Sequence, residues 1–510
     1  MYKSFFPEIF LSMSILFQLI YNIKIINNVK YNYPIIDKEV FYQTIFILVC
    51  AFLIYNNLRI ESFFSNFIFI NNESTKIIKM IVLIISFLTL HIIMQAFAVQ
   101  SLNFFEFFII FLLSLLALLL LTCSSDLISF YLLIEMQSLC FYILASFKRN
   151  SSFSSEAGLK YFISGAFISV IFLFGASLLY GCLGTLNFNS LLLLLSFPIE
   201  SYEMHSLIVL SVLCITSTLL FKIACAPFHF WAPDVYEGSP LSSTIIFSII
   251  PKVSLIFFFI KWLYAINIFF FEIKHILLIC GILSAFVGTF FALSQKRLKK
   301  LIIYSSISQI GFVVAGLSIN SISSNASVLF FLIIYIMTSI LIWSHFSLFY
   351  DFQSRINTFS NKNTTSLFIS SLTNFFKKNK IWAFSFIIIF FSIGGIPPLT
   401  GFFAKIVIIY EIIADNASST YLNTFAATIL MIISSISIFY YIRIIKTMFF
   451  EPKQNDKRDE NFQTTFHDEF LDRIYTICAF LLALLLLIFY KPSLLLLFCQ
   501  YIILIIENIK

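Results

Sequence analysis

Four ionisable side chains lie in the middle of long apolar stretches of this sequence: Glu135, Lys222, Lys252 and Lys405. A charged group at the centre of a bilayer costs roughly 2.5–3.5 kcal/mol even on lenient insertion scales, so such residues mark ion pathways by default. A nearby carboxylate keeps a lysine charged, and desolvation drives the lysine to release its proton when that partner is lost. The four residues therefore indicate proton transfer, with Glu135 as the partner of Lys222.

A histidine, His229, follows Lys222 at a distance of about two helical turns. The sequence leaves two interpretations open for it: a member of the proton relay, or a hydrogen-bonded histidine of the core. A single buried charge is equally well explained by snorkelling or local pairing, but four at comparable depth, two of them beside helix breaks, favour an ion pathway. Charged residues expected to snorkel at span ends are Glu106, Lys261, Glu272, Glu411 and Asp415. His91 and His345 are expected to be structural histidines with satisfied hydrogen bonds.

The composition explains where these charges must lie. Of the 510 residues, 60% are hydrophobic and 11% are charged, and the mean hydropathy is +0.98. Soluble domains carry about 25% charged residues, so the composition predicts a polytopic protein embedded in a lipid bilayer. In a membrane protein the net charge of +7 says nothing about nucleic acid, and its distribution among the loops matters instead. No nucleic-acid partner is expected. The nine cysteines lack the close pairing of zinc or iron–sulfur sites, so no metal is expected.

We predict an all-α fold, because the sequence divides into apolar stretches of about 20 residues that suit membrane-spanning helices. Loops after odd-numbered spans are rich in Lys and Arg and the others are not, which places both termini on the side opposite to synthesis. The fourteen predicted spans are 5–25, 41–58, 77–99, 104–123, 126–147, 159–184, 205–231, 241–263, 268–294, 298–319, 326–350, 381–413, 421–449 and 471–507.

Two of these spans contain helix-breaking sequences, at Pro227 in the seventh and at Pro397 and Pro398 in the twelfth. Backbone groups freed by a break cannot face lipid, so both breaks must lie inside the protein. The breaks are five spans apart, which predicts two inverted five-helix repeats, as in transporters. The predicted organisation is a single membrane domain over 1–510, with three N-terminal spans in 1–103, a first repeat in 104–263, an inverted second repeat in 268–449, and a polar loop and C-terminal span in 450–510.

Four motifs in these spans resemble the chain 2 family of respiratory NADH:ubiquinone oxidoreductase, or complex I, in its mitochondrial form. They are Glu156–Phe162, Phe221–Pro240, Leu301–Ser308 and Gly395–Lys405. The run from Phe221 to Pro240, with its APFHFWAPDVYEGSP segment, is the specific one. The resemblance covers the chain from about the fourth to the thirteenth span. The plastid relative of complex I looks similar too, but the first two motifs look more mitochondrial.

The resemblance implies an antiporter-like, proton-translocating subunit of the membrane arm. In that family a glutamate of the fifth span modulates a lysine of the seventh, a lysine of the eighth passes protons on, and a residue of the twelfth leads to the exit. Glu135, Lys222, Lys252 and Lys405 match these positions, whereas Gln309 stands where histidine is more common.

The resemblance also sets expectations for partners and location. No nucleotide, flavin, iron–sulfur or quinone motif is visible, so NADH, FMN, iron–sulfur clusters and ubiquinone are expected on other subunits. The other membrane-arm subunits are the expected partners. The expected location is the mitochondrial inner membrane, with both termini on the intermembrane-space side.

Two other functions remain open from the sequence. A cation/proton antiporter, free-standing or multisubunit, carries the same charges. In a purely structural membrane subunit, the buried charges only pair with one another.

Overall fold

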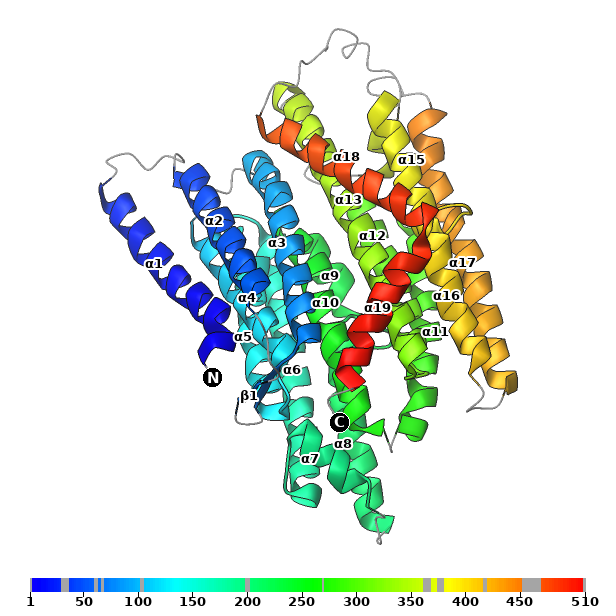
Figure 1. The fold of residues 1–510 in the computed structure, drawn as a ribbon. Helices are drawn as coiled ribbons and strands as arrows, with labels where there is room; N and C mark the ends of the chain where they lie inside the picture. The colour runs from blue at the N-terminus through cyan, green and yellow to red at the C-terminus, as the bar shows by residue number, and fades with distance from the viewer. Residues whose placement is uncertain are drawn as a thin grey trace. The chain divides into compact units, whose positions relative to one another are not determined.

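The computed structural model describes residues 2–28, 36–58, 63–65, 68–100, 105–197, 202–267, 270–360, 368–373, 380–415, 420–451 and 469–507. These residues are almost entirely helical, which confirms the predicted all-α fold, and the one described sheet is a short antiparallel hairpin. The chain forms two compact units (Figure 1). The N-terminal unit comprises residues 1–90, 100–277 and 501–510, and the C-terminal unit comprises 91–99 and 278–500.

Long helices account for most of the predicted spans. Up to residue 294 they are α1 (Phe6–Asn28), α2 (Ile36–Asn57), α3 (Glu73–Gln100), α4 (Glu106–Cys123), α5 (Leu127–Ala145), α6 (Ser152–Leu183), α8 (Tyr202–Lys222), α10 (Leu241–Ala265) and α11 (Phe270–Ser294). Beyond it they are α12 (Leu298–Leu317), α13 (Ile322–Ser360), α15 (Lys380–Gly394), α16 (Thr400–Ala414), α17 (Thr420–Phe449), α18 (Glu469–Tyr490) and α19 (Pro492–Glu507).

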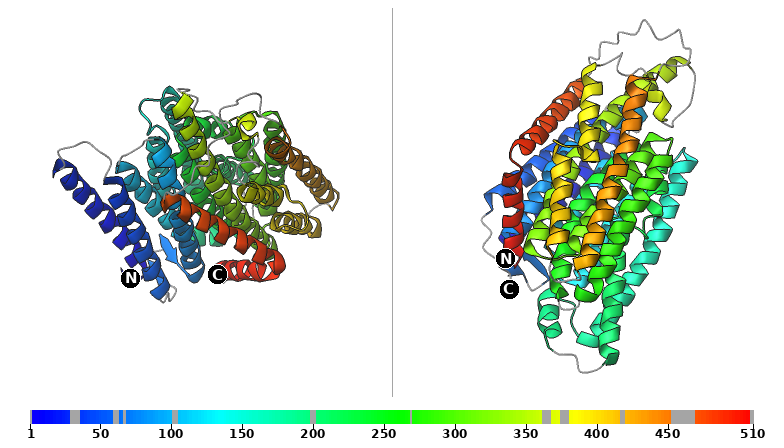
Figure 2. Two further views of the ribbon diagram at one scale, coloured as in Figure 1. Left: turned by 90° about the horizontal axis from the view of Figure 1, so that it is seen from above. Right: turned by 90° about the vertical axis from the view of Figure 1, so that its right-hand side faces the viewer.

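Twelve of the described helices are long and apolar enough to cross a membrane, and α18 with α19 forms a thirteenth candidate, bent by 91°. These helices account for every predicted span except the twelfth. That span consists of two 15-residue helices, α15 and α16, which flank the predicted break. In the C-terminal unit α15, α16 and α17 run side by side, as both side views show (Figures 1 and 2). The inverted relation of the two repeats stays a prediction.

Several short elements are absent from the predicted pattern. They are a 3₁₀ turn at Tyr2–Phe5, strands β1 (Phe63–Ser65) and β2 (Phe69–Asn71), helices α7 (Phe188–Leu195) and α9 (Trp231–Gly238), and a 3₁₀ turn at Ile369–Leu372. Helix α13 also continues to Ser360, ten residues beyond the end predicted for the eleventh span. A helix of eight residues is too short for a periodicity signal to establish it.

Helix α10 is the centre of the N-terminal unit. Its apolar window is completely buried, whereas only a third of the window of α6 is. A helix that is hydrophobic on all sides is expected to be buried on all sides. Lys252, which follows Pro251 in α10, is therefore enclosed by protein and is only 5% exposed.

The start of α16 packs so closely on the end of α15 that only glycine fits there. A Cβ atom built on Gly401 would lie 1.7 Å from the carbonyl oxygen of Ser392. Because that oxygen belongs to backbone, the clash cannot be relieved by a side-chain rotation. The break thus depends on a glycine as well as on its prolines.

We expect Gly401→Ala to lower the amount and thermal stability of the assembled protein, because the two half-helices must separate to admit the methyl group. The matched control is Gly181→Ala in α6, where no neighbouring atom lies within 4 Å of the added Cβ. There alanine should be neutral or stabilise by about 0.5–1 kcal/mol, since it favours helix over glycine. Equal thermal stability of the two variants would contradict this account of the break.

Candidate proton-transfer site

Helix α8 ends in a turn that leaves Lys222 as its last helical residue. Ala224 has the left-handed backbone conformation, with φ of 59°. Its N–H donates to the Phe221 carbonyl (2.9 Å), and the N–H of Cys225 donates to the Leu220 carbonyl (2.9 Å). This pair of bonds is the Schellman motif, which satisfies carbonyls that a helix end would otherwise leave unpaired. The ammonium of Lys222 therefore lies at the negative end of the helix dipole, where a cation is favoured.

The segment after the break is tied back to α8. The indole Nε1 of Trp231, the first residue of α9, donates to the Phe221 carbonyl at 3.1 Å. The two rings of Trp231 and Phe221 also stack, with centroids 5.4 Å apart. The carbonyl next to Lys222 thus has two donors, and α9 holds the broken end in place.

Glu135 and Lys222 face the same small cavity, which α5, α6 and α8 line. It has room for about one water molecule. The Nζ of Lys222 and the Oε1 of Glu135 are buried without a hydrogen-bond partner among the described residues, while Oε2 of Glu135 accepts a long bond of 3.4 Å from Ser138. No ion pair within 4.0 Å joins Glu135 to Lys222. The two groups are close enough to share a cavity and too far apart to be locked together.

A second cavity is lined by both Lys222 and Lys252. Gln137 and Ser138 of α5 line it with polar atoms, and Tyr161 of α6 lines it with an aromatic ring. Lys222 is therefore the residue that the two cavities have in common. The sequence predicts Glu135 as the partner of Lys222, and the two residues share a cavity without forming an ion pair. The proton-transfer roles of Glu135, Lys222 and Lys252 stay predictions.

The C-terminal unit contains a break of the same design. Gly395 has φ of 82°, its N–H donates to the Ser392 carbonyl (3.2 Å), and the N–H of Ile396 donates to the Phe391 carbonyl (3.1 Å). This is again the Schellman pattern. The left-handed residues Ala224 and Gly395 each come three residues before a cis-proline, Pro227 and Pro398 respectively.

Lys405 is placed against this second break. Its Nζ donates to the carbonyl of Gly394, the last residue of α15, at 2.9 Å and lies 5.5 Å from the ring centroid of Phe312. The side chain is 4% exposed and lines a cavity with Gln309, Tyr335 and Thr338. The Nε2 of Gln309 donates to the Ile393 carbonyl at 3.3 Å, so Gln309 braces the break.

His229 lies in the turn between α8 and α9 and is 5% exposed. Its Nδ1 is buried without a hydrogen-bond partner among the described residues, and its ring contacts Phe230 at 4.5 Å. By contrast, His345 has both ring nitrogens engaged, with Ser385 at 2.7 Å and the Leu341 carbonyl at 2.8 Å. The structural interpretation of His345 is therefore confirmed, and the relay role of His229 stays a prediction.

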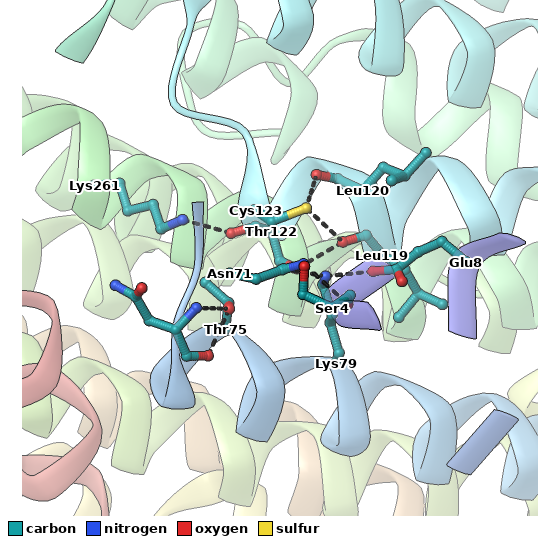
Figure 3. A network of polar contacts seen from close by, with 11 residues as sticks. Ser4, Glu8, Asn71, Thr75, Lys79, Leu119, Leu120, Thr122, Cys123 and Lys261 are labelled. Carbon is teal, nitrogen blue, oxygen red and sulfur yellow. Dashed lines mark hydrogen bonds and ion pairs between the residues drawn. The ribbon is translucent and has the colours of Figure 1, made fainter. Parts of the chain in front are cut away.

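A buried polar network in the N-terminal unit was not predicted from the sequence (Figure 3). Lys79 of α3 forms an ion pair with Glu8 of α1 at 2.5 Å and donates to Asn71 of β2 at 2.7 Å. Lys79 is 1% exposed and Glu8 is 4% exposed. Both residues lie near the ends of apolar runs, where a sequence pattern does not distinguish a buried charge from a snorkelling one.

Lys261, which the sequence places at an interface, belongs to the same region and is half-buried. Its Nζ donates to the Thr122 carbonyl at 2.6 Å (Figure 3). The Nζ also lies 5.3 Å from the centroid of the Phe257 ring. Thr122 is next to the last residue of α4, so this ammonium also stabilises a helix C-terminus. Among the described residues no group of three or more His, Cys, Asp or Glu side chains is arranged to hold a metal ion.

Comparison with known proteins places this site in a family. Residues 124–434, which include both breaks and all five predicted site residues, match the model of the transmembrane domain of NADH:quinone oxidoreductase and Mrp antiporters. The chain belongs to this family. It is similar to NADH-ubiquinone oxidoreductase chain 2 of Marchantia polymorpha, with 36% identity over 465 residues, 88% of this chain and 89% of the relative. The resemblance found in the sequence is thereby confirmed.

Solved structures share the fold. One is a chain of respiratory complex I from Thermus thermophilus with bound aureothin, with a TM-score of 0.72 and 22% identity over 96% of this chain and 98% of that one. Another is a chain of the Mrp complex from Dietzia, with a TM-score of 0.75 and 16% identity over 99% of this chain and 97% of that one.

The ion pair of Glu8 and Lys79 generates a stability prediction. Glu8→Gln leaves the buried ammonium without its counter-ion, which should destabilise the N-terminal unit by about 3–5 kcal/mol. The double change Glu8→Gln with Lys79→Gln should cost less than the single one, because no charge is left unpaired. Thermal unfolding of the purified assembly measures both. The exposed Lys491→Gln is the control, expected within about 0.5 kcal/mol of wild type.

Proposed function

We propose that this chain is a proton-translocating subunit in the membrane arm of respiratory complex I, where it couples NADH-to-ubiquinone electron transfer on other subunits to proton movement. The family and the similarity to chain 2 support this function. The observation that carries the mechanism is the position of Lys222, which lines two cavities, one shared with Glu135 and one with Lys252.

The arrangement supports a switch in the charge of Lys222. While the carboxylate of Glu135 is ionised and near, it stabilises the ammonium. When Glu135 withdraws or is neutralised, the desolvated ammonium loses its compensation and releases its proton. Because the only other lysine in its second cavity is Lys252, the proton passes in that direction. The missing ion pair in the structure matters here, since a tight pair at hydrogen-bond distance would hold the charge on Lys222.

Lys405 performs the corresponding exchange in the C-terminal unit. The structure offers its ammonium a helix-end carbonyl and an aromatic face in place of a carboxylate. Such a site stabilises the charged form moderately, so Lys405 can also deprotonate. We assign to it the role of passing protons to the exit, and to His229 a supporting role at the break of α8.

The chain's membrane, partners and orientation follow from the same function. It lies in a lipid bilayer, contacts other membrane-arm subunits, and belongs to the mitochondrial inner membrane with both termini on the intermembrane-space side. The alternation of basic loops and the similarity to a chain 2 protein support this location. Redox cofactors and ubiquinone are assigned to other subunits, and no nucleic acid or metal is involved.

A cation/proton antiporter is the second candidate, since the fold is shared with a chain of an Mrp complex. Native electrophoresis separates the candidates. Migration with NADH oxidation activity in a large assembly supports complex I, whereas migration alone or in a small assembly without that activity supports the antiporter.

Lys222→Met should abolish the share of proton pumping that passes through this chain, because methionine fills a similar volume and cannot carry a proton. The assembled complex should persist, since the break of α8 is stabilised by backbone bonds and Trp231. The measurement is proton uptake or release per NADH oxidised in sealed vesicles. Undiminished pumping in a fully assembled complex would show that Lys222 is not the relay residue.

Exchanging Glu135 and Lys222 tests whether this pair is merely structural. A pair that only neutralises charge tolerates the exchange. A relay does not, because the lysine would then lie on α5, away from the cavity with Lys252. We expect an assembled complex that oxidises NADH with reduced pumping. Wild-type pumping in the exchanged variant would instead favour the structural interpretation.

A further inference from the structure

Three charged side chains form a bridge on the surface of the N-terminal unit, where α6 begins and α9 follows the broken α8. Lys160 of α6 lies 2.8 Å from Glu156, one turn earlier, and 3.4 Å from Asp234 of α9. Each of the three side chains is about half exposed, between 49% and 59%. We call this group the surface bridge. It joins α6 to α9, the short helix that follows the broken end of α8.

Immediately inside the surface bridge lies a pair of stacked aromatic rings. Tyr161 follows Lys160 in α6, and Trp231 precedes Asp234 by three residues in α9. Their rings are nearly parallel, with an interplanar angle of 3° and centroids 4.7 Å apart. Tyr161 is 5% and Trp231 is 7% exposed, so the pair separates solvent from what lies behind it.

What lies behind the rings is the cavity of Lys222 and Lys252. Tyr161 and Trp231 both line that cavity, together with Tyr236 of α9. The hydroxyl of Tyr236 donates to the Phe247 carbonyl at 3.3 Å. The order from outside to inside is therefore an exposed carboxylate, a buried aromatic pair and a cavity with two lysines.

Helix α9 has further contacts at both ends of this arrangement. At one end the indole of Trp231 is bonded to the Phe221 carbonyl of α8. At the other, a Cβ atom on Gly238 would lie 2.6 Å from the carbonyl oxygen of Phe153 and 2.9 Å from the Cβ of Ala157. Between them the contact of Lys160 with Asp234 is the one that depends on charge. It can be broken by a proton without breaking the others.

We propose that Asp234 takes up protons for Lys222 and that the stack of Tyr161 on Trp231 is a gate that the Lys160–Asp234 contact keeps closed. This inference rests on the proposed function. A proton from bulk water forms an O–H bond with the Asp234 carboxylate, which neutralises it and removes its attraction for Lys160. Lys160 keeps Glu156 as its partner, and the rings of Tyr161 and Trp231 part while the other contacts hold α9 in place. The Asp234 O–H bond then breaks as the proton passes inward and forms an N–H bond on Lys222.

A plain alternative is that the surface bridge only braces α9. Exposed ion pairs contribute about 0.2–1 kcal/mol, which is little for a brace that already has the indole bond and the Gly238 contact. The same small energy suits a gate, because a contact worth much more would not open during turnover. The two interpretations differ in passive proton leak. Loss of a gate contact raises the leak, whereas loss of a brace leaves it unchanged.

The test uses the assembled complex in sealed vesicles, with pumping per NADH oxidised and passive proton leak without NADH as readouts. Asp234→Asn should lose as much pumping as Lys222→Met, and Asp234→Glu should restore it. Glu237→Gln, on the same helix, is the control and should pump as wild type. Wild-type pumping by Asp234→Asn, while Lys222→Met has lost it, overturns the inference and leaves the proposed function standing. Wild-type pumping by both overturns the proposed function itself.

The leak measurement decides the gate independently, should Asp234→Asn fail to assemble. Lys160→Gln removes the contact that keeps the gate closed and retains the uptake carboxylate. The leak should rise about two- to fivefold, the range set by an exposed ion pair of up to about 1 kcal/mol. A leak equal to that of wild type, with or without a loss of thermal stability, identifies the surface bridge as a brace and overturns the gate.

Discussion

The incomplete compensation of the charge on Lys222 is the constraint on which the N-terminal unit depends. Its ammonium is buried without a hydrogen-bond partner among the described residues, and Glu135 shares its cavity without forming an ion pair. A tight pair would fix the charge, and full isolation would neutralise the amine. The helix dipole at the end of α8 contributes a moderate, fixed stabilisation between these limits. The protonation state of Lys222 can therefore respond to small movements of its neighbours.

Both breaks use the same backbone solution to put a lysine beside a helix end. A Schellman turn with a left-handed residue satisfies the last carbonyls, and a second group completes the end: the indole of Trp231 on α8 and the amide of Gln309 on α15. Their placement differs. Lys222 precedes its break, while Lys405 follows its own and reaches back to the Gly394 carbonyl. A cation placed at a helix C-terminus is thus a recurring element of both units, and Lys261 at the end of α4 is a third instance.

The buried ion pair of Glu8 and Lys79 shows the opposite use of charge. At 2.5 Å, with an additional bond to Asn71, Lys79 is compensated and has no reason to exchange its proton. Lys222, by contrast, has no hydrogen-bond partner among the described residues, which suits the proton-carrying role proposed for it. Lys160 represents a third condition, since it is exposed and shared between two carboxylates. The strength of compensation, more than the presence of a lysine, distinguishes these roles.

The sequence by itself determined the membrane class, the helical spans and both breaks, because hydrophobic length and proline act locally along the chain. It also identified Glu135, Lys222, Lys252 and Lys405, since a charge in an apolar run is unfavourable wherever that run folds. Only the tertiary structure decided which charges share a cavity, because that depends on helices far apart in the sequence. It alone paired Glu8 with Lys79, bonded Lys261 to the Thr122 carbonyl, formed the short helix α9 and stacked Trp231 on Tyr161. Near span ends the sequence pattern is the same for a buried and a snorkelling charge, and packing alone separates them.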